Sequence, residues 1–148
     1  MPRPKPPALT PVSADELELE FYAALQHGDI DRLMAVWSDD DEITCVHPGG
    51  PRLVGMGAIR TAFEAMFSHG PIAAEPHRVR RLDSHSSAVH SVLERVRVKG
   101  SGGEQFAWVV ATNVFLRSSQ GWRLVAHHAS PGTGNEAQEV GEAASTLH

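Results

Sequence analysis

The sequence contains a single cysteine, Cys45, and no run of apolar residues long enough to cross a membrane. One cysteine excludes a disulfide within the chain, and a transmembrane helix would need about 20 consecutive, predominantly apolar residues. A basic segment followed by an apolar one, the pattern of a secretory leader, is missing as well. We therefore expect a soluble protein of a reducing compartment, the cytoplasm, without a membrane partner.

Positive charge is also scarce. The 13 basic residues are scattered and outnumbered by 18 acidic ones, so the formal net charge is −5. Because proteins that bind nucleic acid gather lysine and arginine into patches, we expect no nucleic-acid partner. The content of 41% hydrophobic and 21% charged residues is typical of a globular domain, and 148 residues are enough for one core.

Composition divides the chain into three parts. Residues 1–12 are rich in proline, and residues 132–148 are small, polar and acidic. Such segments bury little apolar surface, so both ends are predicted to be flexible. One folded domain is predicted between them, over residues 13–131.

Helix signals lie in the first half of the chain. Ser13 and Glu16 form the S-x-x-E pattern of a capping box, which predicts a helix from about Ala14 to Gln26. Gly28 can adopt the left-handed conformation that ends such a helix. Two further helices are predicted, a short one after Asp29 and one from about Ala58 to Ser68.

Strand signals dominate the second half. A short strand at Ile43–His47 and a return strand at Arg52–Val54 are followed by four long segments, Ala74–Asp83, Ala88–Lys99, Gln105–Arg117 and Trp122–Ser130. Helices first and strands later predict an α+β domain, with the helices packed on one face of a curved, mainly antiparallel sheet.

The last two segments are expected in the middle of the sheet, covered on both faces, because they are rich in β-branched and aromatic residues and lack proline before Pro131. Strict alternation along the final strand separates its residues into two faces. It places Trp122, Leu124, Ala126 and His128 on one face and Arg123, Val125, His127 and Ala129 on the other.

Two motifs carry a family resemblance. DEITCVHPGGPRLVGMGAIR-x-AF at residues 41–63 and GWRLVAHHAS at residues 121–130 resemble, in this order, the NTF2-like superfamily. They are most similar to SnoaL-like proteins and to the association domain of calcium/calmodulin-dependent protein kinase. The resemblance implies a cystatin-like cone, in which three helices close over a bent sheet around a pocket and the outer sheet face forms a homodimer.

The superfamily contains isomerases, cyclases, dehydratases and assembly domains, so the resemblance does not select a reaction. In the kinase association domain the pocket is lined with arginines. The matching positions in this sequence are Asn113 and Ala129, and the resemblance therefore does not extend to a carboxylate-binding pocket.

Three residues are candidates for acid–base catalysis. The resemblance implies that His127 faces the pocket, while the neighbouring His128 faces the other side. Glu94 shares a strand face with Val92 and Val96, and burial there would raise its pKa toward general-acid duty. The alternative is a cross-strand ion pair with an arginine such as Arg80 or Arg95. Asp41 is the acidic residue nearest the first strand, and its alternative is a solvated turn.

Further residues are candidates for ligand contacts, because binding pockets are mostly apolar with a few polar anchors. Asn113 stands out, since an amide in an apolar strand needs a hydrogen-bond partner, which is either a ligand or a neighbouring group. The aromatic and aliphatic candidates could equally be core. The full set is Trp37, His47, Ile59, Phe63, Phe67, Trp108 and Asn113.

No metal site is predicted. His47, His90 and either His127 or His128 would be the imidazoles of such a site, but no HxH, HxxxH or CxxC spacing supports it. Cys45 lacks an identifiable base and is expected to be a packed strand residue.

Two functions follow as hypotheses. The first is a homodimeric protein that binds a small apolar or amphipathic organic molecule. If it is an enzyme, we expect cofactor-free proton transfer on a carbonyl compound, in an isomerase, cyclase or dehydratase reaction. The alternative is a non-catalytic module that senses a ligand or assembles a complex.

Overall fold

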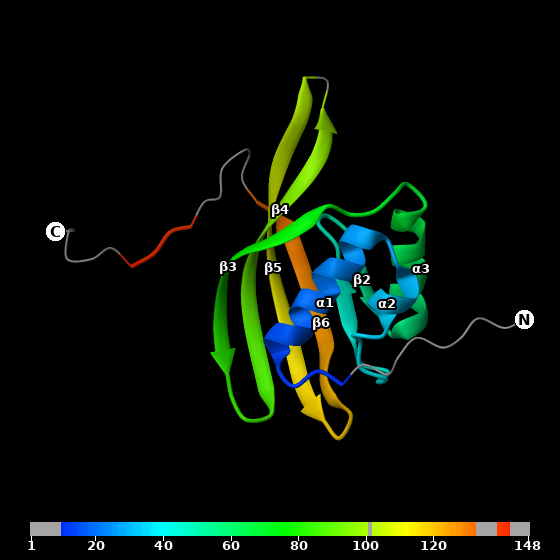
Figure 1. Cartoon of the computed structure of the whole chain (residues 1–148), viewed down its shortest axis with the longest axis vertical. Coiled ribbons are helices and arrows are strands. Elements are labelled where there is room, and N and C mark those ends of the chain that lie inside the picture. Colours follow the sequence, from blue (N-terminus) through cyan, green and yellow to red (C-terminus); the bar gives the residue numbers. More distant parts are fainter. Residues whose placement is uncertain (1–9, 101, 133–138, 143–148) are drawn as a thin grey trace, which may run out of the picture.

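The computed structural model describes residues 10–100, 102–132 and 139–142, so most of both predicted flexible ends lies outside the described residues. Three helices and six strands follow the order α1, α2, β1, β2, α3, β3 to β6 (Figure 1). The helices are α1 (Ala14–His27), α2 (Ile30–Met34) and α3 (Met56–Phe67). The strands are β1 (Thr44–Val46), β2 (Arg52–Val54), β3 (Ala74–Asp83), β4 (Ser87–Gly100), β5 (Gly103–Ser118) and β6 (Gly121–Pro131).

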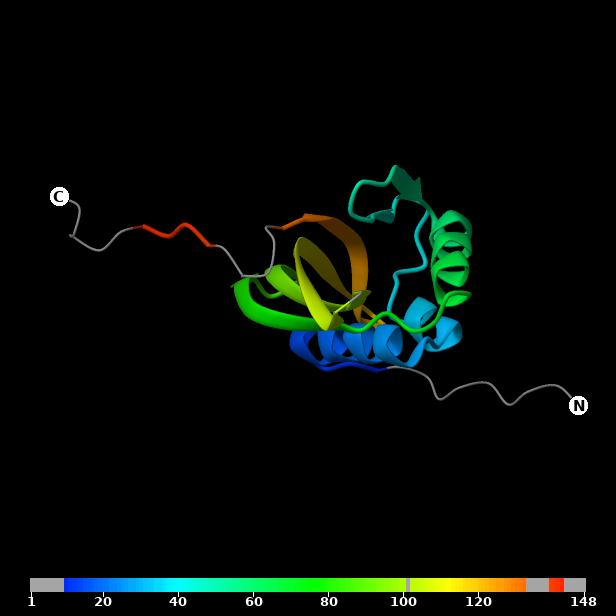
Figure 2. The same ribbon diagram turned by 90° about the horizontal axis from the view of Figure 1, so that it is seen from above.

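All six strands belong to one sheet in the order β2-β1-β6-β5-β4-β3. The predicted central position of the last two strands is confirmed, since β5 lies between β4 and β6. Neighbouring strands pair antiparallel except for β1 and β6, which are parallel. The α+β class and the curved, mainly antiparallel sheet are therefore confirmed, and Figure 2 shows the curl of the long strands over α1.

Helix α1 begins and ends where its sequence signals place it. The Ser13 hydroxyl accepts a hydrogen bond from the backbone N–H of Glu16 at 3.1 Å, and Gly28 ends the helix with φ of 64°. The helices do not form one N-terminal group, however, because β1 and β2 separate α2 from α3. The predicted layout of three N-terminal helices on the sheet thus holds only in part.

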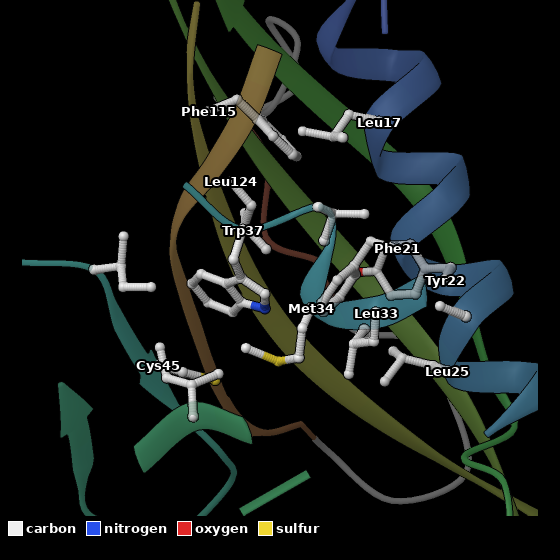
Figure 3. Packing of buried hydrophobic residues seen from close by; sticks show 14 of the residues in the cluster. Leu17, Phe21, Tyr22, Leu25, Leu33, Met34, Trp37, Cys45, Phe115 and Leu124 are labelled. Carbon is white, nitrogen blue, oxygen red and sulfur yellow. The ribbon is translucent and has the colours of Figure 1, made fainter. Parts of the chain in front are cut away.

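The hydrophobic core fills the space between α1, α2 and the concave face of the sheet (Figure 3). Leu17 of α1 points toward Phe115 of β5, and Trp37 lies beside Leu124 of β6. Burying each such side chain contributes about 1.5–3 kcal/mol to folding. This packing holds α1 against the strands that carry the polar residues described below.

A β-bulge interrupts the alternation of β6. Val114 pairs with Ala126 but Phe115 pairs with Leu124, which leaves Val125 as an extra residue. Trp122 and Leu124 therefore share the buried face with His127 and Ala129, and the prediction of strict alternation was wrong. His128 points to the outer face and is exposed.

The outer face of the sheet carries apolar side chains without a covering layer in the described part of this single chain. Val89, Val110 and Leu116 are 37%, 39% and 46% exposed. The predicted burial of the central strands on both faces is thus not met within one chain. In the same described part, no helix is long and apolar enough to cross a membrane.

Candidate functional site

A cavity of about 290 Å³ lies between α1, α3 and the concave face of the sheet. Most of its wall is apolar, with side chains from Phe21, Phe63 and Val96 among others. Three polar side chains contribute to the wall, and each comes from a different strand or strand end: His47, Glu94 and His127.

Glu94 is the acid–base group of this wall. It points inward from β4 and is only 6% exposed, and its Oε2 accepts a hydrogen bond from the Tyr22 hydroxyl at 2.7 Å. Burial raises the pKa of Glu94 to about 7, helped by the charge of Glu18 and opposed by the Tyr22 hydrogen bond. The carboxyl group therefore exchanges its proton near neutral pH. No described residue is hydrogen-bonded to its other oxygen, Oε1.

Asn113 lies behind the cavity wall and joins its polar groups. Its Nδ2 donates hydrogen bonds to Glu18 Oε2 at 3.0 Å and to the Tyr22 hydroxyl at 3.2 Å. Its Oδ1 accepts a hydrogen bond from His127 Nδ1 at 2.6 Å. Because both amide hydrogens are donated within the protein, Asn113 positions other side chains and has no free donor for a ligand.

The hydrogen bond to Asn113 holds the His127 ring in one tautomer. Since Asn113 Oδ1 can only accept, His127 Nδ1 carries the proton and Nε2 has a free lone pair. Burial, with smaller contributions from the nearby His47 and His128, lowers the pKa of His127 to about 3. His127 is therefore a neutral hydrogen-bond acceptor at neutral pH and a weak base.

Cys45 lies within β1, and His47 directly follows this strand. The ring of His47 packs edge-on against the ring of Phe63, with centroids 4.8 Å apart. Burial lowers the pKa of His47, so its imidazole is neutral and can donate one hydrogen bond. Cys45 Sγ lies 3.9 Å from His47 Nε2. Burial, with a smaller contribution from Glu94, raises the pKa of the Cys45 thiol to about 12, which makes it a poor nucleophile.

The polar network continues away from the cavity to His90. Glu18 Oε2, which accepts the Asn113 amide, lies 3.0 Å from His90 Nδ1 in a contact too bent for a hydrogen bond. Burial lowers the pKa of His90, but the adjacent carboxylate of Glu18 and the charges of Asp15 and Asp83 outweigh it and raise the pKa overall. We take the 3.0 Å separation as an ion-pair contact.

The structure brings together some of the predicted site residues and separates others. Glu94, His127, His47 and Phe63 line the cavity. Asp41 is exposed in the turn before β1 and is not part of the wall, so the solvated-turn alternative describes it better. Glu94 pairs with Tyr22 and not with an arginine, because Arg80 and Arg95 meet other carboxylates.

The remaining predicted ligand contacts belong elsewhere. Trp37 and Ile59 are core residues that are 3% and 0% exposed, and Phe67 packs on Phe63 with ring centroids 6.2 Å apart. Trp108 points to the outer sheet face, where its ring meets His77 at 5.5 Å. Alternation along β5 explains this, since Asn113 and Ala111 share the inward face and Trp108 falls on the other.

Sequence reasoning missed Glu18 and Tyr22. They are one helical turn apart on α1, and both are buried at 3% and 2% exposure. Each directly follows a core residue, Leu17 or Phe21. Glu18 and Tyr22 are spaced four residues apart beside the apolar stripe of the helix, and this spacing was the signal that both face the sheet.

Comparison with known proteins adds the family context. The model of the SnoaL-like domain family matches residues 15–134. A crystal structure from Thiobacillus denitrificans, provisionally assigned as a calcium/calmodulin-dependent protein kinase type II association domain, is 32% identical with a TM-score of 0.75; the match covers 83% of this chain and 99% of that one. None of the proteins with curated functions matches this chain significantly.

Two other structures are similar. A provisionally assigned dehydratase of the NTF2-like family from Streptomyces avermitilis is 29% identical over 78% of this chain and 90% of that one, with a TM-score of 0.70. The CaMKII hub of S. rosetta is 23% identical over 88% of this chain and 100% of that one, with a TM-score of 0.64, which shows the shared fold. The predicted cystatin-like, NTF2-like fold is thus confirmed.

Proposed function

Because this chain belongs to the SnoaL-like family of the NTF2-like superfamily, we propose that its cavity binds a small, largely apolar carbonyl compound and that Glu94 transfers a proton on it. The observation that carries this proposal is a carboxyl group with a pKa of about 7 in an apolar cavity of about 290 Å³. A group with that pKa is both an effective base and an effective acid near pH 7.

The proposed step needs no cofactor. Glu94 as carboxylate removes a proton from the carbon next to the carbonyl group, and the carboxylic acid that forms returns the proton to another atom of the same molecule. Return to carbon gives isomerisation, and return to a departing hydroxyl group releases water. The second outcome agrees with the provisional dehydratase assignment of the Streptomyces avermitilis relative.

The other polar wall residues have supporting roles in this proposal. His47 is neutral and is placed to donate a hydrogen bond to the carbonyl oxygen, on which negative charge develops. His127 presents an acceptor nitrogen that suits a hydroxyl group of the ligand. Asn113 and Tyr22 hold His127 and Glu94 in place from behind the wall.

The proposal is tested by hydrogen–deuterium exchange of the α-protons of a panel of small cyclic and aromatic ketones in D₂O, followed by proton NMR. We expect catalysed exchange of at least one ketone, reduced about 100-fold or more in Glu94→Gln. Ala107→Trp, which fills the cavity, should remove the exchange, whereas Ala58→Trp on the exposed side of α3 should not. Equal exchange in the parent and in Glu94→Gln would exclude Glu94 as the acid–base group.

Assembly is the second function, and a specific observation favours it. The relatives from Thiobacillus denitrificans and S. rosetta are described as an association domain and a hub, and the outer face of the sheet here exposes Val89, Val110 and Leu116. We propose a homodimer formed through this face, compatible with ligand binding because the cavity lies on the opposite face of the sheet.

A further inference from the structure

A second pocket, separate from the cavity, lies where the start of α1 meets the turn between β3 and β4. Its volume is also about 290 Å³. Unlike the cavity, it gathers charged and polar side chains from four segments of the chain. Those used below are Asp15 of α1, Asp83 of β3 and His90 of β4.

His90 is the buried member of this group. Its side chain is 1% exposed, and its Nε2 has no hydrogen-bond partner among the described residues. A buried imidazole nitrogen without a partner is costly, and most buried polar groups in proteins are satisfied. This nitrogen lies 3.5 Å from Asp83 Oδ1 and 4.0 Å from Asp15 Oδ1. Two carboxylates thus approach this one nitrogen. Among the described residues, His90, Asp15 and Glu18 offer ligand atoms that lie within 4.8 Å of one another.

The separations suit a bound metal ion. Nitrogen and oxygen ligands lie about 2.1 Å from Zn²⁺, so two ligands of a tetrahedral ion are about 3.4 Å apart. The distance of 3.5 Å between His90 Nε2 and Asp83 Oδ1 meets this value, and that of 4.0 Å to Asp15 Oδ1 requires a small movement. Asp15 and Asp83 are 54% and 57% exposed at their side chains, so an ion can enter between them. Asp15 can make this movement once its ion pair with Arg81 is exchanged.

Glu18 contacts the ring nitrogen of His90 that would not bind the metal ion. Its Oε2 lies 3.0 Å from His90 Nδ1, on the side of the ring opposite Nε2. A carboxylate beside the far nitrogen favours the proton on that side of the ring once a metal ion occupies Nε2, an arrangement that is common in metal sites. Asn113 in turn fixes Glu18 by donating to the same oxygen.

We propose that His90, Asp15 and Asp83 form a binding site for one divalent transition-metal ion of the Zn²⁺ class, with Glu18 orienting His90. One imidazole and two carboxylates suit such an ion better than Ca²⁺ or Mg²⁺, which prefer oxygen ligands alone. Arg81 donates to Asp15 Oδ1 at 2.6 Å, so Asp15 binds the ion through its other oxygen or releases the arginine. The site lies outside the cavity and takes no part in the proposed proton transfer, although Glu18 also contributes to the raised pKa of Glu94.

The test is isothermal titration of the full, untagged and metal-stripped chain with ZnCl₂, alongside the absorption spectrum of the Co²⁺-substituted protein. We expect one saturable ion per chain and a Co²⁺ spectrum of a four- or five-coordinate site. His90→Gln should abolish binding, and Asp83→Asn should weaken it more than 10-fold. Glu18→Gln, which removes the charge of the orienting carboxylate, should weaken binding about 10- to 100-fold.

Matched controls separate this site from adventitious binding. His128→Gln and Asp40→Asn change exposed residues outside the pocket and should leave affinity and stoichiometry unchanged. If His90→Gln fails to fold, as judged by circular dichroism, the exposed variants Asp15→Asn and Asp83→Asn decide the question. Absence of saturable binding, or equal affinity in the parent and these variants, would overturn the proposal and leave His90 as part of a metal-free ion cluster.

Discussion

The Tyr22 hydroxyl lies 2.7 Å from Glu94 Oε2 and ties helix α1 to the acid–base group of the cavity. This hydrogen bond favours the carboxylate, whereas burial and the charge of Glu18 favour the neutral acid by a larger amount. The balance leaves the pKa of Glu94 at about 7. Burial thus sets the proton affinity of this strand residue, and two residues of helix α1 adjust it.

Glu94→Gln should change the pH dependence of stability. The unfolded chain loses this proton near the ordinary pKa of 4.5 and the folded chain near 7, so ionisation favours unfolding as pH rises between these values. The change in the free energy of unfolding caused by Glu94→Gln should therefore be more favourable at pH 8 than at pH 4, by up to about 3 kcal/mol. Urea unfolding at both pH values measures this. The exposed variant Glu104→Gln should show no comparable difference.

Asn113→Leu should destabilise the fold through lost hydrogen bonds. Leucine would leave His127 Nδ1 without its acceptor and Glu18 without one donor, at a cost of about 2–4 kcal/mol. Thr112→Val on the exposed neighbouring position is the control and should change the free energy of unfolding by less than about 1 kcal/mol. Similar losses for both variants in urea unfolding would show that the amide network adds little.

Cys45 should be unreactive in the folded protein. Its side chain is 0% exposed and its thiol pKa is raised to about 12, so almost no thiolate exists at pH 8. A disulfide-exchange reagent should modify it only as fast as the chain unfolds, and immediately in denaturant. Rapid modification of the native protein would contradict the packing of β1 against β6.

The outer sheet face should form the dimer. Light scattering after size-exclusion chromatography should give about twice the 16.0 kDa chain mass. Val110→Arg, in the middle of this face, should yield monomers. Val54 of β2 is exposed to a similar extent but lies elsewhere, so Val54→Arg should leave the dimer intact. A monomeric parent protein, or a dimer lost in both variants, would exclude this interface.

The fold was predictable because its signals are local. The cap at Ser13, the αL residue Gly28 and the apolar strands all act within a few residues, and their elements appear close to the expected bounds. The bulge at Val125 was not predictable, since it arises from the pairing of β6 with β5 across the sheet and no residue of β6 alone encodes it.

The site was predictable only in part, for a related reason. The pattern of valines around Glu94 indicated an inward carboxyl group. Its partners Tyr22 and Glu18 come from a helix that is more than 70 residues away in the sequence, and only the packing of α1 reveals them. Asn113 was identified as a buried amide that needs partners, but the choice between ligand and protein partners required the geometry.

The most direct test of the central claim is the ionisation of Glu94 itself. Carbon-13 NMR of the glutamate side-chain carboxyl groups, with Glu94→Gln to assign the signal, follows its titration in the folded protein. We predict that the signal missing from the variant titrates near pH 7 and shifts when a cavity ligand is added. Titration of this signal near 4.5, unaffected by any ligand, would contradict Glu94 as the acid–base group of a binding cavity.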